Sequence, residues 1–398
     1  MMEGYMKIAL VTEVYHPSVN GVVISIDTFR NELCALGHDV IIIASQNKYK
    51  HSDPTDTYRI PSLSIPWTKD YVMSRPDASS YELLRKQKVD IIHTQHMFAM
   101  GWFGLRAGQK YSIPVVHTYH TLITEYTHHI PLLGSFIPTR WMIQKYLINH
   151  TRRYGNAVNA LITPSHAMAH ILRSYGIRRK VNVVSTGINI KSFDVADGDY
   201  IYTRHGLPKN VKIVLFVGRL ASEKSVDLLI RSYAELQKFY THTRLILLGS
   251  GPQQQEYEAL AHTLGISGKV LFPGFVKPDI ARHYFRAAYI FAFPSHTDTQ
   301  GIVIAEAMAA GAAVVAVNKL GPTDIIKNGY NGLLVMQTVT SMSNALQRLL
   351  TNKAFHDRLV RSACESVKRY STQVQTHELV KVYTETIRSY ASGGPTGI

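Results

Sequence analysis

Short apolar runs recur along the chain and are separated by longer segments with helical spacing. In the first half these runs are 8–11, 40–44, 90–94, 114–117, 160–163 and 181–184. Helical spacing lies between several of them, as at 22–36 and 165–175. Strands that are apolar on both faces are buried between helices, as in a parallel sheet. The pattern therefore predicts a doubly wound α/β domain over residues 1–190.

A second alternation begins after a polar segment at 191–210. That segment contains two glycine breaks and Pro208, which is typical of a linker. Beyond it the apolar runs are 213–217, 245–248, 270–272, 289–293, 313–317 and 332–335, and helical spacing is found at 226–239, 253–264, 302–310 and from about 341 to 389. We expect a second doubly wound domain over 191–370. A C-terminal helix and tail, 371–398, should pack back on the first domain.

The fold class expected from these patterns is α/β, with two doubly wound Rossmann-like domains that face a cleft. Ligands of such domains bind at the carboxyl ends of the strands, against loops and helix N-termini. The loops that follow the strands are therefore the places where candidate chemistry is expected.

Charge and cysteine content narrow the class of protein. The 398 residues carry a formal net charge of +15, and the two cysteines are Cys34 and Cys364. Two distant cysteines offer neither a disulfide framework nor a metal-ligand spacing, so a reducing compartment is expected. A basic protein attracts nucleic acid, anionic membrane surfaces or phosphorylated ligands. Nucleic acid is the least favoured, because no zinc-finger spacing or RNP-type aromatic motif occurs.

The hydrophobic stretches of the sequence indicate whether the chain could cross a membrane or carry a signal peptide. The longest one, 301–317, is interrupted by Glu306 and is shorter than the roughly 20 residues that span a bilayer. The N-terminal run to Val11 lacks the small-residue cleavage pattern of a signal peptide. We therefore expect a soluble or peripheral protein.

Two carboxylates separated by seven residues form the most specific motif, Asp298-Thr-Gln-Gly301-Ile302-Val-Ile-Ala-Glu306. Asp298 is expected in a strand-to-helix loop, and Glu306 within the following helix. Gly301 permits a tight turn and close approach of a ligand, and the free amides near Ile302 suit a phosphate. One carboxylate can hold sugar hydroxyls and the other ribose hydroxyls. An amphipathic helix with a capping Asp is the structural alternative, but the Ser-x-Thr-Asp-Thr-Gln-Gly pattern is too particular for it.

A basic motif follows the first strand of the second half, Phe216-Val-Gly218-Arg219-Leu-Ala-Ser-Glu-Lys224. Arg219 offers a planar fork for phosphate oxygens, and Lys224 adds a compact positive charge. Together they can stabilise a diphosphate leaving group electrostatically. Solvated basic residues at a helix start are the alternative interpretation.

Both motifs resemble those of the family 4 retaining glycosyltransferases, which have the two-Rossmann-domain GT-B architecture. The resemblance extends from Lys7 to about Tyr390. It implies that Arg219 and Lys224 bind the diphosphate of a nucleotide-sugar donor. Asp298 stands where the family usually has Glu, so the carboxylate that contacts the sugar is one methylene shorter.

Weaker pieces of the resemblance lie elsewhere in the chain. Gly21 matches a glycine-containing loop after the first strand, with Asn20 where a second glycine is common. Phe275 stands where the family contacts the donor base, and a packed aromatic ring is the equally weighted alternative. The resemblance thus extends the expected donor site to both halves of the chain.

The segment from Val115 to Pro131 bears on the acceptor. His120 lies three residues beyond the apolar strand, and the resemblance makes it the family's active-site histidine, which contacts the donor sugar. The run after His120 is similar to the Tyr-His-Thr…Glu/Asp-Tyr-x-His segment of the bacterial diacylglycerol glucosyltransferases. His117 is interpreted instead as a satisfied strand residue.

Residues 139–154 can form an amphipathic basic helix. Its apolar side would carry Trp141, Met142, Tyr146 and Leu147. Such a helix suits an interfacial position on anionic lipid, where each basic residue contributes about 1 kcal/mol. A helix that packs its apolar side on the first domain is an alternative of similar weight. The excess of basic residues in this half of the chain favours the membrane.

The motifs and the resemblance together imply a retaining glycosyltransferase that moves a hexose, glucose from UDP-glucose, onto a membrane lipid such as diacylglycerol. No cofactor or metal is required, because Arg219 and Lys224 can act as the cation. The expected location is cytoplasmic, peripherally at the inner face of the membrane. The expected catalytic residues are His120, Asp298, Arg219 and Lys224, and the expected donor-binding residues are Gly21, Gly218, Arg219, Lys224, Phe275, Asp298, Gly301, Ile302 and Glu306.

Three alternatives remain at this stage. A mannosyltransferase that uses GDP-mannose on a phosphatidylinositol-type lipid has the same motifs. A soluble transferase could build a surface polysaccharide. A non-enzymatic basic binder of membrane or nucleic acid is the alternative from a different class, and the joint presence of the catalytic candidates argues against it.

Overall fold

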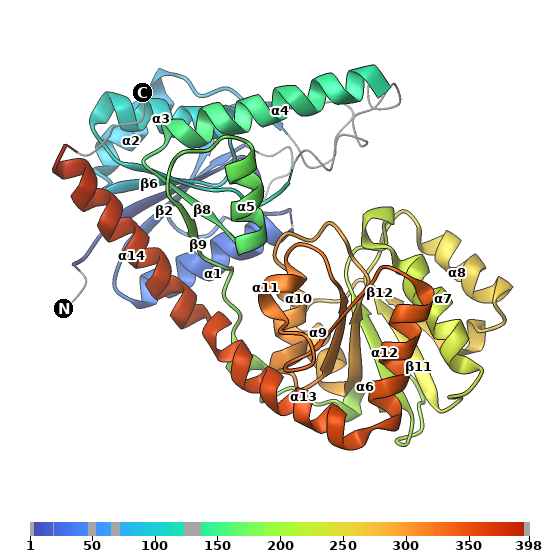
Figure 1. The fold of residues 1–398 in the computed structure, drawn as a ribbon. Coiled ribbons are helices and arrows are strands. Elements are labelled where there is room, and N and C mark those ends of the chain that lie inside the picture. The colour runs from blue at the N-terminus through green and yellow to red at the C-terminus, as the bar shows by residue number, and fades with distance from the viewer. Residues whose placement is uncertain (1–3, 19, 47–52, 65–71, 123–136, 394–398) are drawn as a thin grey trace. The chain divides into compact units, whose positions relative to one another are not determined.

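The chain folds into two compact units. The computed structural model describes residues 4–18, 20–46, 53–64, 72–122 and 137–393 (Figure 1). Unit 1 consists of residues 1–187 and 372–398, and unit 2 of residues 188–371. The chain enters and leaves unit 2 at neighbouring points, because Ile188 and Ser371 form a β-bridge and the Ile188 amide donates to the Tyr370 carbonyl at 2.9 Å. Unit 2 is thus an insertion into unit 1.

Unit 1 is built on a seven-stranded parallel sheet. In spatial order the strands are β3 (Thr57–Ile60), β2 (Asp39–Ser45), β1 (Lys7–Thr12), β6 (Ile91–Thr94), β7 (Val115–Thr118), β8 (Ala160–Thr163) and β9 (Val181–Val183). The order reverses between β1 and β6, so the carboxyl ends of these two strands form the switch point at which doubly wound sheets bind ligands. A separate antiparallel pair joins β4 (Ser62–Ser64) to β5 (Val72–Ser74).

Helices cover both faces of this sheet. They are α1 (Gly21–Ala35), α2 (Ala78–Gln87), α3 (Ala99–Tyr111), α4 (Ile137–Ala157), α5 (His166–Ser174) and α14 (Thr372–Ala391). Successive strand residues point to opposite faces, so Ile8 packs with residues of α1 and α14, and Ala9 with residues of α2, α3 and α5. Helix α14, red in Figure 1, lies against α1, and its Tyr383 hydroxyl is 2.6 Å from His93 Nδ1. The C-terminal helix thereby completes the core of unit 1.

Unit 2 is a second Rossmann-like unit, with a six-stranded parallel sheet. Its strands in spatial order are β12 (Val270–Gly274), β11 (Thr243–Leu248), β10 (Lys212–Val217), β13 (Ala288–Phe293), β14 (Ala313–Val317) and β15 (Leu333–Val335). Its helices are α6 (Asp199–Arg204), α7 (Val226–Gln237), α8 (Gln254–Thr263), α9 (Pro278–Ala287), α10 (Ile302–Ala309), α11 (Pro322–Ile325), α12 (Val339–Thr351) and α13 (Lys353–Ser366), with short 3-10 turns η2 (Ile190–Phe193), η3 (Ser222–Lys224), η4 (Ser267–Lys269) and η5 (Val367–Tyr370). The order reverses between β10 and β13. The predicted α/β class with two doubly wound domains is confirmed.

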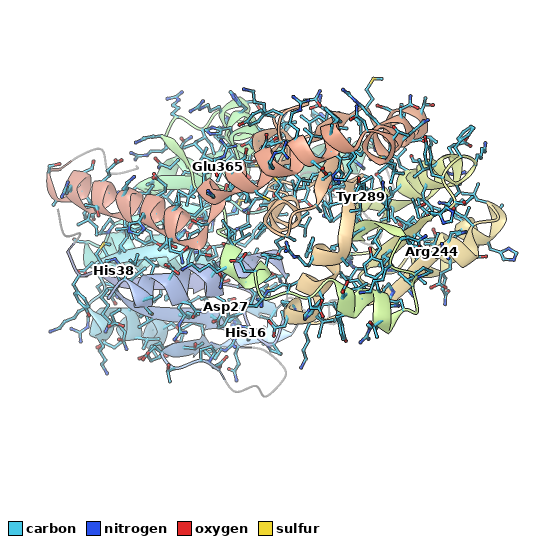
Figure 2. All side chains as sticks on the ribbon, turned by 90° about the horizontal axis from the view of Figure 1, so that it is seen from below. His16, Asp27, His38, Arg244, Tyr289 and Glu365 are labelled. Atoms are coloured by element: carbon cyan, nitrogen blue, oxygen red, sulfur yellow. The ribbon has the colours of Figure 1, made fainter. Side chains whose placement is uncertain are left out.

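Aromatic stacking fixes helix α13 to the sheet of unit 2. The ring of Tyr289, labelled in Figure 2, stacks on His356 with centroids 3.9 Å apart and planes 7° from parallel. His356 Nε2 also lies 3.0 Å from the Tyr289 carbonyl oxygen. Helix α13 therefore belongs to unit 2, whereas the next helix, α14, belongs to unit 1.

Two local predictions are wrong. Residues 191–210, expected as a linker, fold into η2 and α6, and the polar segment is held by Ile201, which is fully buried. The single helical stretch expected from 341 to 389 is divided into α12, α13, η5 and α14. Asn352 ends α12, and its side chain caps α13 by accepting from the Phe355 amide at 2.9 Å. Such a side chain favours a helix start over a helix interior.

Candidate functional site

The switch point of unit 2 brings the basic and acidic motifs together. Lys224 ends the η3 turn that follows β10, and Asp298 follows β13, the neighbouring strand. Lys224 Nζ donates to Asp298 Oδ2 at 2.5 Å, and the two side chains are only 18% and 21% exposed. A partly buried ion pair therefore joins two motifs that lie 74 residues apart in the sequence.

Asp298 is held as a carboxylate. Its Oδ1 accepts from the Gly301 amide at 3.0 Å, and its carbonyl accepts from the Gly321 amide at 2.9 Å. Burial raises the pKa of Asp298, but Lys224 and the backbone amides of Gly301 and Gln300 outweigh burial and keep the pKa below its usual range. Gly301 adopts φ +71°, which a residue with a side chain rarely adopts. The turn that fixes Asp298 thus depends on glycine.

Further hydrogen bonds lock the two loops to each other. The Glu223 carbonyl accepts from Thr297 Oγ1 at 3.2 Å and from Ser295 Oγ at 3.5 Å. His296 Nδ1 lies 2.9 Å from Ser225 Oγ. The sequence analysis gave these residues no role. The sequence does mark them, because a run of polar side chains follows a buried strand directly. A loop that only connects two elements does not require such a run.

Close backbone contacts shape the neighbouring part of the site. A Cβ atom at Gly249 would lie 2.0 Å from the Gly218 carbonyl oxygen, and one at Gly251 would lie 2.2 Å from the Leu220 carbonyl oxygen. The loops after β10 and β11 therefore pack backbone against backbone, which requires glycine. Gly218 was expected in the site, whereas the pair in Leu248-Gly-Ser-Gly was overlooked, although glycines directly after a strand are the usual signal of close approach.

The other expected donor residues also lie in unit 2. Arg219 is exposed in the loop after β10, and Phe275 is 65% exposed after β12, so its ring is not packed in the core. Ile302 begins α10, and Glu306 lies one turn further on. Burial raises the pKa of Glu306 to about 7, although Arg282 acts to lower it. Within the described ranges, no three His, Cys, Asp or Glu side chains gather as metal ligands could.

In unit 1, His120 lies at a small cavity at the carboxyl ends of β6 and β7. The cavity has a volume of about 40 Å³. It is lined by Val22, Gln95, His96, Met97, Phe98, His117, Thr118, Tyr119, His120 and Thr121. His120 Nε2 lies 2.7 Å from Gln95 Oε1, so Nε2 carries a proton and the amide oxygen accepts it in a hydrogen bond. Gln95 therefore orients the His120 ring.

The histidines around this cavity are neutral. Burial lowers the pKa of His120 and of His117 to about 3, and that of His96 to about 4. His117 is bonded within the sheet, since its Nδ1 lies 3.0 Å from Thr94 Oγ1 and its ring packs on Tyr154 with centroids 4.9 Å apart. His117 is thus held within the sheet, although it lines the cavity together with His120.

Glu13 lies directly after β1 and was missed by the sequence analysis. Its Oε1 accepts from the Met100 amide at 3.1 Å and so caps helix α3, whose own N-cap residue Phe98 provides no side-chain bond. Burial raises the pKa of Glu13 to about 7, although the Met100 and Ala99 amides act to lower it. The Glu13 amide also donates to His96 Nδ1 at 3.2 Å. No local motif marks this residue, because its burial depends on tertiary packing.

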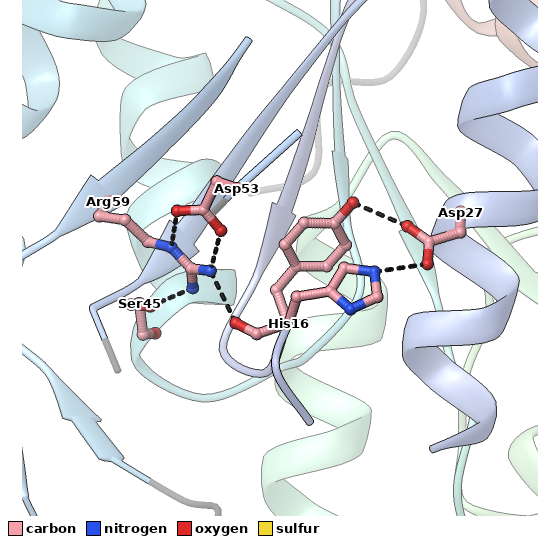
Figure 3. A network of polar contacts seen from close by, with 6 residues as sticks. His16, Asp27, Ser45, Asp53 and Arg59 are labelled. Carbon is pink, nitrogen blue, oxygen red and sulfur yellow. Dashed lines mark hydrogen bonds and ion pairs between the residues drawn. The ribbon is translucent and has the colours of Figure 1, made fainter. Parts of the chain in front are cut away.

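A polar network holds the loop between β1 and α1 (Figure 3). Arg59 donates to the Ser45 carbonyl at 2.9 Å and to the His16 carbonyl at 2.7 Å, and it forms an ion pair with Asp53. His16 Nε2 in turn lies 2.7 Å from Asp27 Oδ2 on α1. The loop that leads to the α1 N-terminus is therefore tied to β2 and to α1 itself.

The N-terminus of α1 lies beside the His120 cavity. Asn20 Oδ1 caps the helix by accepting from the Val22 and Val23 amides, both at 3.0 Å. Val22 lines the cavity. Gly21 begins the helix, and no atom lies within 4 Å of a Cβ atom placed there. The space around Gly21 is open, so packing does not demand a glycine at this position.

Part of the expected acceptor segment lies outside the described residues. The positions concerned are Glu125, Tyr126, His128, His129 and Pro131. The described part of this segment reaches the cavity through His117, Thr118, Tyr119, His120 and Thr121.

The expected membrane helix corresponds to most of α4. Trp141, Met142 and Tyr146 are 61%, 63% and 64% exposed, whereas Leu147 is buried. The aromatic side of α4 is thus turned to solvent, and Leu147 packs inward. None of the helices in the described ranges combines the length and apolar character that a bilayer crossing requires.

Two family profiles match the chain. The profile of Glycosyltransferase Family 4 matches residues 19–192, and that of Glycosyl transferases group 1 matches residues 201–366. The first match falls almost entirely within unit 1, and the second falls within unit 2. Each profile therefore covers one Rossmann-like unit.

Several known proteins are similar over most of their length. The chain is 30% identical to the alpha-monoglucosyldiacylglycerol synthase of Streptococcus pneumoniae over 318 residues, 78% of this chain and 71% of the relative. It is 27% identical to the protein of the same name from Acholeplasma laidlawii, over 96% and 98% of the two chains. A GDP-mannose-dependent alpha-mannosyltransferase of Corynebacterium glutamicum is 26% identical, over 96% and 89%. The solved structure of Anabaena Alr3699/HepE in complex with UDP shares the fold, with a TM-score of 0.75, 17% identity and coverage of 96% and 100%.

Proposed function

The chain belongs to the family 4 glycosyltransferases, and on that basis we propose that it moves a hexose, glucose from UDP-glucose, onto a membrane lipid such as diacylglycerol. The ion pair between Lys224 and Asp298 at the switch point of unit 2 is the observation that carries the donor half of this proposal. The acceptor half is supported by the likeness to two alpha-monoglucosyldiacylglycerol synthases. Family membership also implies that the anomeric configuration is retained.

Positive charge in unit 2 would stabilise the leaving group. When the bond between the sugar and the diphosphate breaks, negative charge grows on the phosphate oxygen. Arg219 and Lys224 interact more strongly with that charge in the transition state than in the ground state, which lowers the barrier. In this proposal the two side chains supply the positive charge, so no metal ion is invoked. The leaving phosphate takes the proton of the acceptor hydroxyl as the new glycosidic bond forms.

The carboxylates would hold the neutral parts of the donor. Asp298, kept ionised by its surroundings, can accept a hydrogen bond from a sugar hydroxyl. Glu306, one turn into α10, can accept from the ribose hydroxyls, while the amides at the start of the helix near Ile302 face the phosphates. Phe275, exposed at the end of β12, is proposed to lie against the base.

Unit 1 would supply the groups around the acceptor and the sugar. His120 is neutral, so it can form a hydrogen bond to a sugar hydroxyl without adding positive charge at the reaction centre. Gln95 holds the ring in place. The amides at the start of α1, near Gly21, lie beside the same cavity.

A mannosyltransferase that uses GDP-mannose is the second candidate. It is supported by the likeness to the mannosyltransferase of Corynebacterium glutamicum over 96% of this chain. The phosphate-binding groups of unit 2 would serve both donors equally, because a diphosphate is common to UDP and GDP. The two candidates therefore differ in the base, the sugar and the acceptor lipid.

A donor panel tests the proposal. The purified protein is supplied with radiolabelled UDP- and GDP-sugars and either diacylglycerol or a membrane lipid extract, and the products are identified by mass. We expect label to pass from UDP-glucose to diacylglycerol. Transfer from GDP-mannose to a phosphatidylinositol-type lipid would establish the second candidate instead, and transfer to a water-soluble glycan alone would contradict a lipid acceptor.

We also propose that the enzyme works peripherally at the inner face of the membrane, with α4 on the lipid surface. The exposure of Trp141, Met142 and Tyr146 beside basic residues supports this placement. Replacing Trp141 and Tyr146 by serine should reduce flotation with anionic vesicles. The matched control is Phe239→Ser in unit 2, which removes an aromatic ring that is 75% exposed. An equal response of the two variants would contradict the role of α4.

A further inference from the structure

Unit 1 contains a basic surface cavity that shares no residue with the proposed donor and acceptor sites. It has a volume of about 1140 Å³. Its lining residues come from α3, α4, the end of α5 and the turn between α5 and β9, all of them elements of unit 1 that are drawn in Figure 1. Its lining includes the ring of Trp102 and five guanidinium groups, those of Arg152, Arg153, Arg173, Arg178 and Arg179. Five positive charges therefore lie around one cavity.

Asn156 holds the turn that carries two of these arginines. Its Oδ1 accepts from the Arg178 amide at 2.8 Å, and its Nδ2 donates to the Gly176 carbonyl at 3.2 Å. Its own carbonyl accepts from Arg179 Nε at 3.2 Å. The end of α4 and the turn after α5 are therefore fixed to each other, so that arginines from both elements line one cavity.

The arginines of α4 are held by neutral partners. Arg152 Nη2 donates to Asn149 Oδ1 at 2.7 Å, and its Cδ lies only 3.0 Å from the position of a Cβ atom at Gly176, which adopts φ +88°. The Arg153 guanidinium lies 5.8 Å from the centre of the Trp102 ring. Neutral partners orient these side chains and leave their positive charge uncompensated.

No carboxylate of the surrounding sequence balances this charge. Residues 126–193 contain nine Lys or Arg and no Asp or Glu. Among the ion pairs that join described residues, none involves Arg152, Arg153, Arg173 or Arg178. Like charges held in one cavity repel one another, and an anion bound between them removes the repulsion.

The exposed face of α4 leads from aromatic residues into this cavity. Trp141, Lys145, Asn149 and Arg152 are all exposed and follow one another at helical spacing. The apolar part of this face lies toward the N-terminus of α4, and the basic part toward its C-terminus. An aromatic surface next to a basic cavity suits a phospholipid, whose phosphate lies just above its acyl chains.

We propose that the cavity formed by α3, α4 and the turn after α5 is a phosphate-binding site. Guanidinium forks match pairs of phosphate oxygens, and several forks around one cavity can bind one phosphate from different sides. A phospholipid headgroup and a soluble phosphorylated compound present the same group to the cavity. This site goes beyond the proposed sugar transfer, and transfer to a dispersed acceptor in neutral detergent does not depend on it.

The test compares two double variants that each remove two positive charges from unit 1. Arg173→Gln with Arg178→Gln removes two cavity side chains that make no hydrogen bond or ion pair with the rest of the described chain. Lys86→Gln with Lys110→Gln is the control, because both lysines are exposed and lie outside the cavity. Pyrophosphate binding is measured by calorimetry with saturating UDP present, so that the proposed diphosphate site of unit 2 is occupied. Flotation is measured with vesicles of phosphatidylcholine with and without phosphatidylglycerol. Thermal unfolding of each variant is compared first.

We expect the cavity variant to bind at least about tenfold more weakly than the parent protein, and the control to remain within about twofold. Each basic residue near lipid phosphate contributes about 1 kcal/mol, and two such residues correspond to roughly thirtyfold. Weakening toward anionic vesicles alone identifies a lipid headgroup, and weakening toward pyrophosphate identifies a soluble phosphate. Equal weakening by both variants, or a parent protein that binds neither probe, would overturn the proposal.

Discussion

The switch points of the two sheets have the same strand topology, but the side chains at one are charged and the histidines at the other are neutral. In unit 2, Lys224 and Asp298 are both charged and form a partly buried ion pair. In unit 1, His96 and His120 are neutral, and Glu13 has a pKa near 7 because it is buried. Fixed positive charge suits the diphosphate of the proposed donor, whereas the neutral side chains of unit 1 can bind hydroxyl groups without adding charge. The residues that follow the strands, and not the sheets themselves, create this difference.

Removing the charge from unit 2 should have the largest effect. Lys224→Ala eliminates one cation at the proposed diphosphate site and leaves Asp298 without its partner, so transfer should fall about a hundredfold to a thousandfold. The measurement is the rate of label transfer to lipid at saturating donor. Lys238→Ala, which removes an exposed lysine of the same unit, serves as the control. Full activity of the Lys224 variant would contradict the donor assignment.

Neutralising Glu13 should change stability rather than charge balance in the site. Its folded pKa is raised from 4.5 to about 7, so the native state keeps a proton that the unfolded chain loses. Stability therefore falls as pH rises from about 4.5 to 7, by roughly 3 kcal/mol. Glu13→Gln should abolish this share of the pH dependence, so the variant should gain stability relative to the parent protein between pH 5 and pH 8. Chemical unfolding at both pH values measures the difference, and parallel curves would refute the burial effect.

Changing the neutral site of unit 1 should have a moderate effect on transfer. His120→Ala removes a hydrogen bond to the sugar and should lower transfer about tenfold. Gln95→Leu frees the His120 ring and should have a smaller effect in the same direction. Because His120 has a pKa of about 3, it should contribute no limb to the pH profile of transfer between pH 5 and 8. A limb that disappears in the His120 variant would show that the ring is charged during the reaction.

The smallest expected effect concerns donor affinity. Glu306 has a pKa of about 7, so its carboxylate, the better acceptor for ribose hydroxyls, forms as pH rises from 6 to 8. The ratio of UDP affinity at pH 8 to that at pH 6 should therefore be about fivefold larger for the parent protein than for Glu306→Gln. Calorimetry at pH 6 and 8 gives both values, and ionisation of UDP itself cancels in the comparison. Identical pH dependence in the two proteins would separate Glu306 from the donor.

The strands and the basic and acidic motifs that follow them could be recognised because their signals are local. A strand buried on both faces is a continuous apolar run, as at 313–317, and the residues of each motif are contiguous in the sequence. The linker prediction at 191–210 failed because two buried residues, Phe193 and Ile201, fix an otherwise polar segment to unit 2. A largely polar pattern does not reveal two isolated apolar anchors.

The parts of the site that escaped prediction depend on distant contacts. Glu13 is an ordinary acidic residue in the sequence, and it becomes a helix cap only because α3 begins beside it. The backbone contact of Gly249 with Gly218 joins two loops from different strands. The five arginines of the basic cavity come from α4, α5 and the following turn, which are brought together by Asn156. No local spacing encodes such convergence.

The pairing of Ile188 with Ser371 places both ends of unit 2 at one point. A segment with adjacent ends can be replaced as a cassette, since the host needs only a short connection at a single place. Residues 188–371 could therefore be exchanged for the corresponding segment of a relative that uses another nucleotide sugar. Unit 1, whose core α14 completes, would keep its own sequence unchanged. Recombination at this pair of positions offers a route to new donor and acceptor combinations.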